Sequence, residues 1–121
     1  MKTAEIANQL VELCRKGENA VVKEKFYSPD IVSVEAMDSP AGPRESRGIA
    51  AVKKKGEWWV NAHTVHKASV DGPYLAADKF SVIFDYDLTV KATGQRVQMK
   101  EVAVYTVDNG KIVLEEFLYK M

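Results

Sequence analysis

The longest regular pattern in this 121-residue chain is an alternation of apolar and polar side chains over residues 79–91. A period of two places successive side chains on opposite faces of a β-strand. The pattern therefore predicts a strand with one unbroken apolar face, formed by Phe80, Val82, Phe84, Tyr86, Leu88 and Val90.

Two turn signals fold the segments that follow into an antiparallel meander. Residues 92–95 are typical of a turn, and residues 97–107 resume the alternation as a further strand. Asn109-Gly110 is the strongest local turn signal, because both residues tolerate the positive φ that a tight hairpin needs. The hairpin around it carries three carboxylates among apolar residues, namely Glu101, Glu115 and Glu116.

Helical spacing dominates the first part of the chain. Residues 3–16 carry an apolar stripe, with Thr3 as a candidate N-cap and Gly17 as a candidate C′ residue. Shorter helices are predicted over residues 20–26 and 49–59.

Two more strands are predicted around the last of these helices. One spans residues 61–71 and ends in a turn at Asp71-Gly72-Pro73, whereas the prolines and glycines of residues 37–48 are typical of a loop. The other strand spans residues 31–36, and its alternation puts three residues on one face: Ile31, Ser33 and Glu35. Helices followed by a meander predict an α+β fold, a single domain over residues 1–121 with helices on one face of a curved sheet.

The charge balance excludes several classes of partner. Lys+Arg and Asp+Glu number 17 each, so there is no basic field for nucleic acid or anionic membranes. No run approaches the roughly 20 apolar residues of a membrane span, and the N-terminus lacks the pattern of a signal peptide. The single cysteine, Cys14, suits a reducing compartment and is expected to be a buried, inert thiol. We expect a cytoplasmic domain.

The sequence predicts neither a metal site nor a bound cofactor. His63 and His66 are three residues apart, which on a strand puts them on opposite faces. No Gly-rich phosphate loop and no nucleophile motif is present. The run Lys53-Lys54-Lys55 is expected to form a solvated helix surface.

Three segments, "LVELCRKGENAVVKEKFYSPDIVSVEA", "RGIAAV" and "DNGKIVLEEFLY", resemble in order and spacing the SnoaL-like branch of the nuclear transport factor 2-like superfamily. The resemblance implies a cone in which three N-terminal helices close over a strongly curved, mostly antiparallel sheet and leave a pocket, and it implies a homodimer. The superfamily includes ketosteroid isomerases, polyketide cyclases, dehydratases and members without a known reaction. The fold therefore leaves the function open.

The ketosteroid-isomerase pattern is only partly present. Its carboxylate base follows a Tyr-x-x-Asp segment, and here the segment ending at Asp30 is followed by Glu35. Its two donors to the enolate correspond to Leu10 and Ala103, which cannot donate a hydrogen bond. Each such donor stabilises the transition state by about 3 kcal/mol. Because both donors are missing, the resemblance disfavours steroid isomerisation by that mechanism.

The same resemblance gives the direction of the side chains. If Ala103 faces the cavity, Glu101 and Tyr105 face it too. Glu115 would then point inward and Glu116 outward, although a register slip of one residue would exchange them. By the resemblance, further residues line the same concave side, namely Phe80, Phe84, Tyr86, Phe117 and Tyr119. Two other residues are candidate ligand contacts: Trp59, which would cap the mouth of the cone, and His66, which would act as a donor or proton carrier.

Two functional hypotheses follow. The first is an enzyme that moves protons on a small, apolar, carbonyl-bearing molecule, with Glu35 as base and Glu101 or Tyr105 as acid or oxyanion partner. Its reaction could be isomerisation, dehydration or aldol closure, without a cofactor. The second is a non-catalytic domain that binds a small ligand or dimerises.

Overall fold

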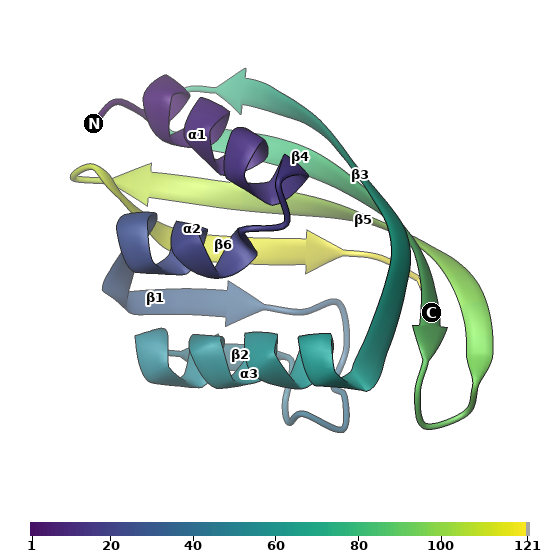
Figure 1. Ribbon diagram of the computed structural model, residues 1–121. Helices are drawn as coiled ribbons and strands as arrows, with labels where there is room; N and C mark the ends of the chain where they lie inside the picture. The colour runs from purple at the N-terminus through teal and green to yellow at the C-terminus, as the bar shows by residue number, and fades with distance from the viewer. Residues whose placement is uncertain (121) are drawn as a thin grey trace.

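A six-stranded sheet bends around three helices in the computed structural model, which describes residues 1–120 (Figure 1). The helices are α1 (Thr3–Arg15), α2 (Asn19–Phe26) and α3 (Ile49–Ala62). The strands are β1 (Tyr27–Val34), β2 (Glu45–Arg47), β3 (His63–Ala76), β4 (Lys79–Val90), β5 (Gln95–Asp108) and β6 (Lys111–Leu118).

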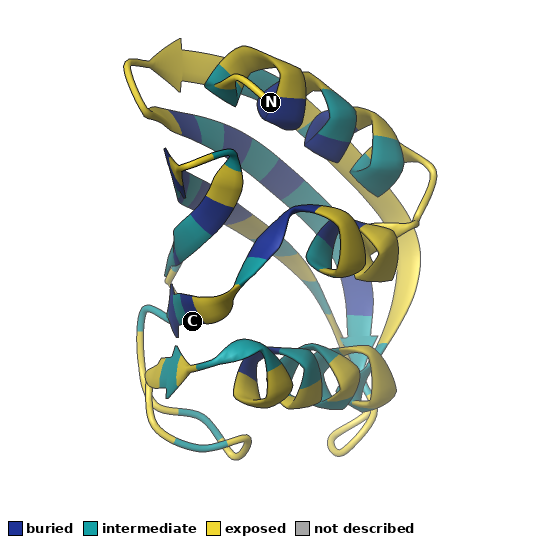
Figure 2. Ribbon diagram, turned by 90° about the vertical axis from the view of Figure 1, so that its left-hand side faces the viewer, coloured by how far each residue is buried: buried dark blue, intermediate teal, exposed yellow. Residues whose placement is uncertain are grey.

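The strand order is β2-β1-β6-β5-β4-β3, and every pair is antiparallel except β1 with β6. All three helices lie on the concave side of the sheet (Figure 2). The predicted α+β architecture, with helices on a single face of a curved and mostly antiparallel sheet, is confirmed.

Helix α1 packs its apolar stripe into the core, where Ile6 and Leu10 are fully buried. The prediction of Thr3 as N-cap is wrong, because Lys2 caps the helix and Thr3 is its first residue. The backbone N–H of Lys2 donates to the Glu5 carboxylate at 3.1 Å, which satisfies a donor at that end. Gly17 follows the helix at a φ of 74°, as predicted for a C′ residue.

The predicted turn at Asp71-Gly72-Pro73 is wrong. Strand β3 continues through it to Ala76, and the pairing with β4 shifts between Asp71 and Tyr74, so Gly72 and Pro73 form a bulge. β3 is the edge strand of the sheet, where a proline without an N–H is tolerated. The predicted loop of residues 37–48 also contains a strand, β2, which pairs with β1.

The alternation in β4 and β5 builds the core as predicted. Phe80, Val82 and Phe84 are at most 3% exposed on the concave face. Pairing with β5 and β6 continues this face, since Tyr105 lies opposite Glu115. Glu115 is 2% exposed, so the register that points it inward is correct.

The hairpin between β5 and β6 turns at the predicted pair, where Asn109 has φ 49° and Gly110 has φ 74°. In contrast, Gly56 lies inside helix α3, where a β-carbon would meet only the end of the flexible Lys23 side chain at 3.3 Å.

We therefore expect the same substitution to act with opposite signs at these two glycines. Gly110→Ala should destabilise the protein by about 1–2 kcal/mol, because an L-residue is strained at positive φ. Gly56→Ala should stabilise it by up to about 1 kcal/mol through helix propensity. Urea denaturation monitored by circular dichroism measures both, and effects of the same sign would contradict the turn geometry.

Candidate functional site

A cavity of about 630 Å³ opens between the helices and the concave face of the sheet. This volume lies within the range of about 300–1,000 Å³ that is usual for small-molecule sites. Its lining includes most of the residues predicted from the sequence: Glu35, Trp59, Phe84, Tyr86, Glu101, Tyr105, Phe117 and Tyr119.

Two predicted ligand contacts lie elsewhere. Phe80 is 1% exposed and stacks on the Tyr105 ring at 4.9 Å between centroids, so it fills the core and does not line the cavity. His66 lies where the β3 register shifts between Val65 and Lys67, and its Nε2 is 2.7 Å from the hydroxyl of Thr89 on the outer face of β4. The prediction that these two side chains face the pocket is wrong.

Lys55 is a cavity residue that the sequence analysis missed. Its ammonium lies 3.3 Å from a Glu35 carboxylate oxygen, donates a hydrogen bond to the Ser33 hydroxyl, and sits 5.1 Å from the centroid of the Phe117 ring. The prediction of a solvated surface is therefore wrong for this lysine, whose side chain is only 14% exposed. Its spacing from Val52 and Trp59, at three and four residues along α3, was the available signal for a shared helix face.

Glu35 and Lys55 form a half-buried ion pair that connects the end of β1 to α3. Burial is the largest influence on the Glu35 carboxyl and raises its pKa, while the charge and hydrogen bond of Lys55 act in the opposite direction. The net pKa lies above the ordinary value. Lys55 therefore stabilises the ionised form of the Glu35 carboxyl, which burial alone would destabilise.

Glu115 is a buried residue of the cavity lining. The Tyr27 hydroxyl donates a short hydrogen bond to it, and both residues are buried. Burial, followed by the charge of Glu115, raises the pKa of Tyr27 well above its usual range, so the phenol remains a donor.

Glu101 has a different environment from the other two carboxyls. It is 9% exposed, lines the cavity, and has neither a hydrogen bond nor an ion pair with any residue from 1 to 120. Burial, with the charges of Glu35 and Glu115, raises its pKa to about 8. Glu101 is consequently protonated near neutral pH, whereas Glu35 has a cationic partner.

Aromatic rings form the wall beside Glu101. The Trp59 ring packs against His63 and Tyr86, with centroids 4.7 Å and 5.1 Å away. His63 is held by a 2.7 Å hydrogen bond between its Nδ1 and the Trp59 carbonyl. Burial, and then the charge of Glu101, raises the pKa of Tyr86. The hydroxyl of Tyr86, like that of Tyr105, has no hydrogen-bond partner among the described residues.

Cys14 also lines the cavity, from helix α1. Burial raises the pKa of its thiol to about 11, which disfavours the nucleophilic thiolate.

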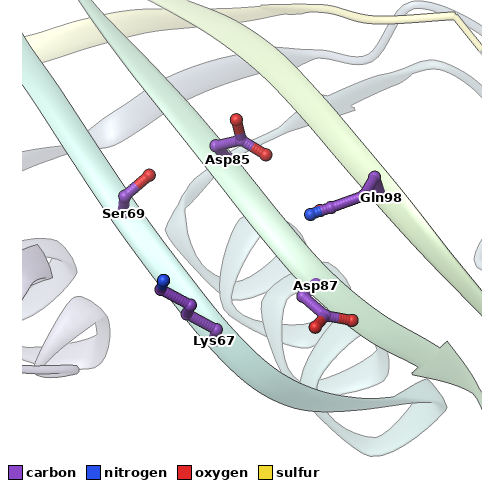
Figure 3. Close-up of a pocket in the computed structure, with 5 residues that line it drawn as sticks. All are labelled: Lys67, Ser69, Asp85, Asp87 and Gln98. Atoms are coloured by element: carbon purple, nitrogen blue, oxygen red, sulfur yellow. The ribbon is translucent and has the colours of Figure 1, made fainter.

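The outer face of the sheet carries a second, smaller depression of about 160 Å³ (Figure 3). Its walls are polar side chains of β3, β4 and β5, and its Asp87 is paired with Arg96 at 2.8 Å. Within residues 1–120, no group of three or more His, Cys, Asp or Glu side chains is arranged to hold a metal ion. The helices of the described chain are all too short or too polar to cross a membrane.

Comparison with known proteins gives consistent results. A family model described as SnoaL-like domain matches residues 1–119. A candidate SnoaL-like polyketide cyclase from Mesorhizobium loti, also described as a carbohydrate phosphatase, is 48% identical with a TM-score of 0.93, and the match covers 98% of this chain and 100% of that chain. No curated protein matches the chain.

More distant structures share the fold alone. An NTF2-like protein from Burkholderia thailandensis is 19% identical with a TM-score of 0.83, over 99% of this chain and 92% of that chain. A candidate SnoaL-like polyketide cyclase from Jannaschia is 12% identical with a TM-score of 0.76, over 98% of this chain and 85% of that chain.

The ion pair predicts how Glu35 responds to loss of Lys55. In Lys55→Met, burial and the charge of Glu115 act without the opposing ammonium, so the pKa of Glu35 should rise above its wild-type value. A carbon-detected NMR titration of the side-chain carboxyl measures this change directly. Lys55→Arg should keep the wild-type titration, and so should Lys54→Met at the exposed neighbouring position. An unchanged Glu35 titration in Lys55→Met would contradict the role given to this lysine.

Proposed function

The chain belongs to the SnoaL-like domain family, and we propose that its cavity carries out cofactor-free acid–base chemistry on a small apolar compound that bears a carbonyl group. The observation that carries this proposal is the contrast between two carboxyls on one cavity. Glu35 is paired with a cation, whereas Glu101 is buried without a partner. Two titratable groups in such different environments can divide the roles of base and acid.

Glu35 is the proposed base. Lys55 favours its ionised form, and burial raises its pKa toward the range in which a carboxylate accepts a proton from carbon more readily. In the reaction, Glu35 takes a proton from the carbon next to the carbonyl group, and the electron pair of the C–H bond moves onto the carbonyl oxygen as an enolate.

Glu101 and Tyr105 are the proposed donors to that oxygen. A protonated carboxyl and a neutral phenol can each donate a hydrogen bond to a developing oxyanion. Tyr105 stays protonated because burial, followed by the charge of Glu115, raises its pKa well above the usual range. Apolar walls from Phe84, Phe117 and Trp59 favour an apolar body for the substrate.

The reaction of the ketosteroid isomerases, which belong to the wider superfamily, is a poor match to these donors. Leu10 and Ala103, at the two donor positions of the ketosteroid isomerases, are apolar and fully buried. Glu101 lies two residues from Ala103 on the same face of β5, so a donor at this site would approach the substrate from a different point. Isomerisation of another compound, dehydration and intramolecular aldol closure all begin with the same proton abstraction.

We also propose that the chain forms the homodimer that the family resemblance implies, and that the two copies pair through the outer face of the sheet. No helix covers this face (Figure 2), and the apolar residues on it are half-buried or exposed. Ile83, Val102 and Leu118 form one continuous row across β4, β5 and β6. A cytoplasmic location remains a prediction from the sequence.

Exchange of substrate protons for solvent deuterium tests the proposed base without assuming the later reaction. A panel of small apolar ketones incubated in heavy water should show enzyme-dependent deuterium uptake next to the carbonyl. Glu35→Gln should lower the exchange rate by about 10²–10⁴-fold while the chain stays folded by circular dichroism. Exchange that persists in this variant removes Glu35 as base, and a panel without any exchange favours the non-catalytic, ligand-binding alternative.

The proposed acid gives a distinct pH signature. Glu101 donates a hydrogen bond below its pKa of about 8 and loses its proton above it, so the exchange rate should fall as the pH rises through that value. Glu101→Gln retains an N–H donor that does not titrate, so this alkaline limb should disappear while part of the activity remains. If the exchange rate of Glu101→Gln still falls at alkaline pH, the titrating group is a different residue.

Sedimentation equilibrium tests the pairing of two copies. The wild-type chain should be a dimer, and Val102→Glu should shift it to monomer because a charge in the centre of an apolar interface is costly to bury. Val21→Glu, at an exposed position of α2 on the opposite side of the sheet, serves as the matched control. A monomeric wild-type chain would contradict the proposed dimer.

A further inference from the structure

The cavity contains more carboxyl groups than cations to neutralise them. Glu35, Asp38, Glu101 and Glu115 all line it, against the ammonium groups of Lys23 and Lys55. The Lys55 ammonium is already in contact with Glu35, the Ser33 hydroxyl and the Phe117 ring. The interior therefore has a negative electrostatic potential at the one carboxyl without a partner, Glu101.

Glu101 is an unpartnered polar side chain that faces this cavity and is only 9% exposed. The cavity walls remove much of the water that would solvate a negative charge on Glu101, and either a bound proton or a bound cation can offset that cost. In the free protein, a bound proton neutralises the Glu101 carboxyl. The same negative field that retains a proton on Glu101 would attract a ligand cation to it.

The walls around Glu101 are suited to an ammonium group. Phe84 lies opposite it on β4, and the Tyr86 ring stacks on Phe84 with centroids 6.0 Å apart. Ring faces attract cations, and neutral phenol oxygens accept hydrogen bonds from N–H groups. Lys55 over Phe117 shows that this cavity already holds one ammonium against an aromatic face.

We propose that the cavity binds small apolar molecules that carry a protonated amine, with Glu101 as the counter-ion and the aromatic wall of Phe84 and Tyr86 beside it. Binding replaces one cation by another: the carboxyl releases its proton to solvent, and the ligand ammonium takes its place beside the carboxylate. The inference concerns the cavity of the proposed function, yet it requires only binding and no turnover. It adds amines as a ligand class to the neutral carbonyl compounds proposed above.

Other titratable groups act on this exchange. The groups coupled to Glu101 by charge come from α3 and from the β1, β4, β5 and β6 segments, and they are Glu35, Lys55, Tyr86, Tyr105, Glu115 and Tyr119. Burial, followed by the charges of Glu35 and Glu101, raises the pKa of Tyr119 to about 12, and burial also raises those of Tyr86 and Tyr105. These phenols therefore stay neutral, so the proton released near neutral pH comes from Glu101.

Isothermal titration calorimetry with three ligands of similar shape tests the inference. The ligands are phenethylamine, phenethyl alcohol and hydrocinnamate, whose groups at neutral pH are cationic, neutral and anionic. Phenethylamine should bind at least about tenfold more tightly than phenethyl alcohol, and hydrocinnamate should bind most weakly. Titrations in buffers of different ionisation enthalpy should show release of close to one proton with the amine and none with the alcohol.

Glu101→Gln is the decisive variant, because glutamine keeps the shape of the protonated carboxyl but cannot take a negative charge. It should lose both the preference for the amine and the proton release, while phenethyl alcohol still binds. Glu116→Gln, on the outer face of the adjacent strand β6, should behave like the wild type. Continued binding of the alcohol shows that the variant is folded.

Several results would overturn the inference. Equal binding of amine and alcohol, tighter binding of hydrocinnamate, or an amine preference that survives in Glu101→Gln would each exclude Glu101 as counter-ion. Failure of deuterium exchange with ketones would leave the amine result intact, and failure of amine binding would leave the exchange result intact. The two proposals can therefore fail separately.

Discussion

The bend of the long strands β3, β4 and β5 is the constraint on which the rest of the structure depends (Figure 1). Three short helices cover the concave face that results, and they fill only part of it. One alternating face therefore has two roles. Near Phe80 and Val82 it is a packed core, and from Phe84 toward Tyr86 it becomes the wall of a cavity.

Polar groups inside this cavity are stabilised in three different ways. Glu115 receives a hydrogen bond from Tyr27, and Glu35 pairs with Lys55, which also contacts Ser33. Glu101 has no such partner, and it avoids the cost of a buried charge by retaining a proton. These three carboxyls all belong to glutamates, so they differ in chemistry only because their neighbours differ.

Residue spacing predicted the sheet well and the helix contacts poorly. A strict period of two gave the faces of Glu101, Tyr105 and Phe84 correctly, because β4 pairs with β5 from Lys79 to Val90 without a register shift. The prediction for His66 was wrong because its side chain lies on the outer face at a bulge in β3, and bulges leave little trace in a single sequence. Lys55 was missed because its burial depends on how α3 crosses β1, and such a tertiary contact cannot be derived from one helix alone.

Glu101 connects the two ligand classes that the cavity is proposed to accept. With its proton it donates a hydrogen bond, which suits a carbonyl oxygen, and without its proton it accepts an ammonium group. The change between these states requires no rearrangement of the protein, because a carboxyl occupies the same space in both. A charged ligand would therefore compete with a neutral one for the same wall of Phe84 and Tyr86. The free energy of releasing the Glu101 proton near neutral pH would determine which of the two ligands binds. A single buried side chain without a partner is sufficient to make the cavity selective by charge.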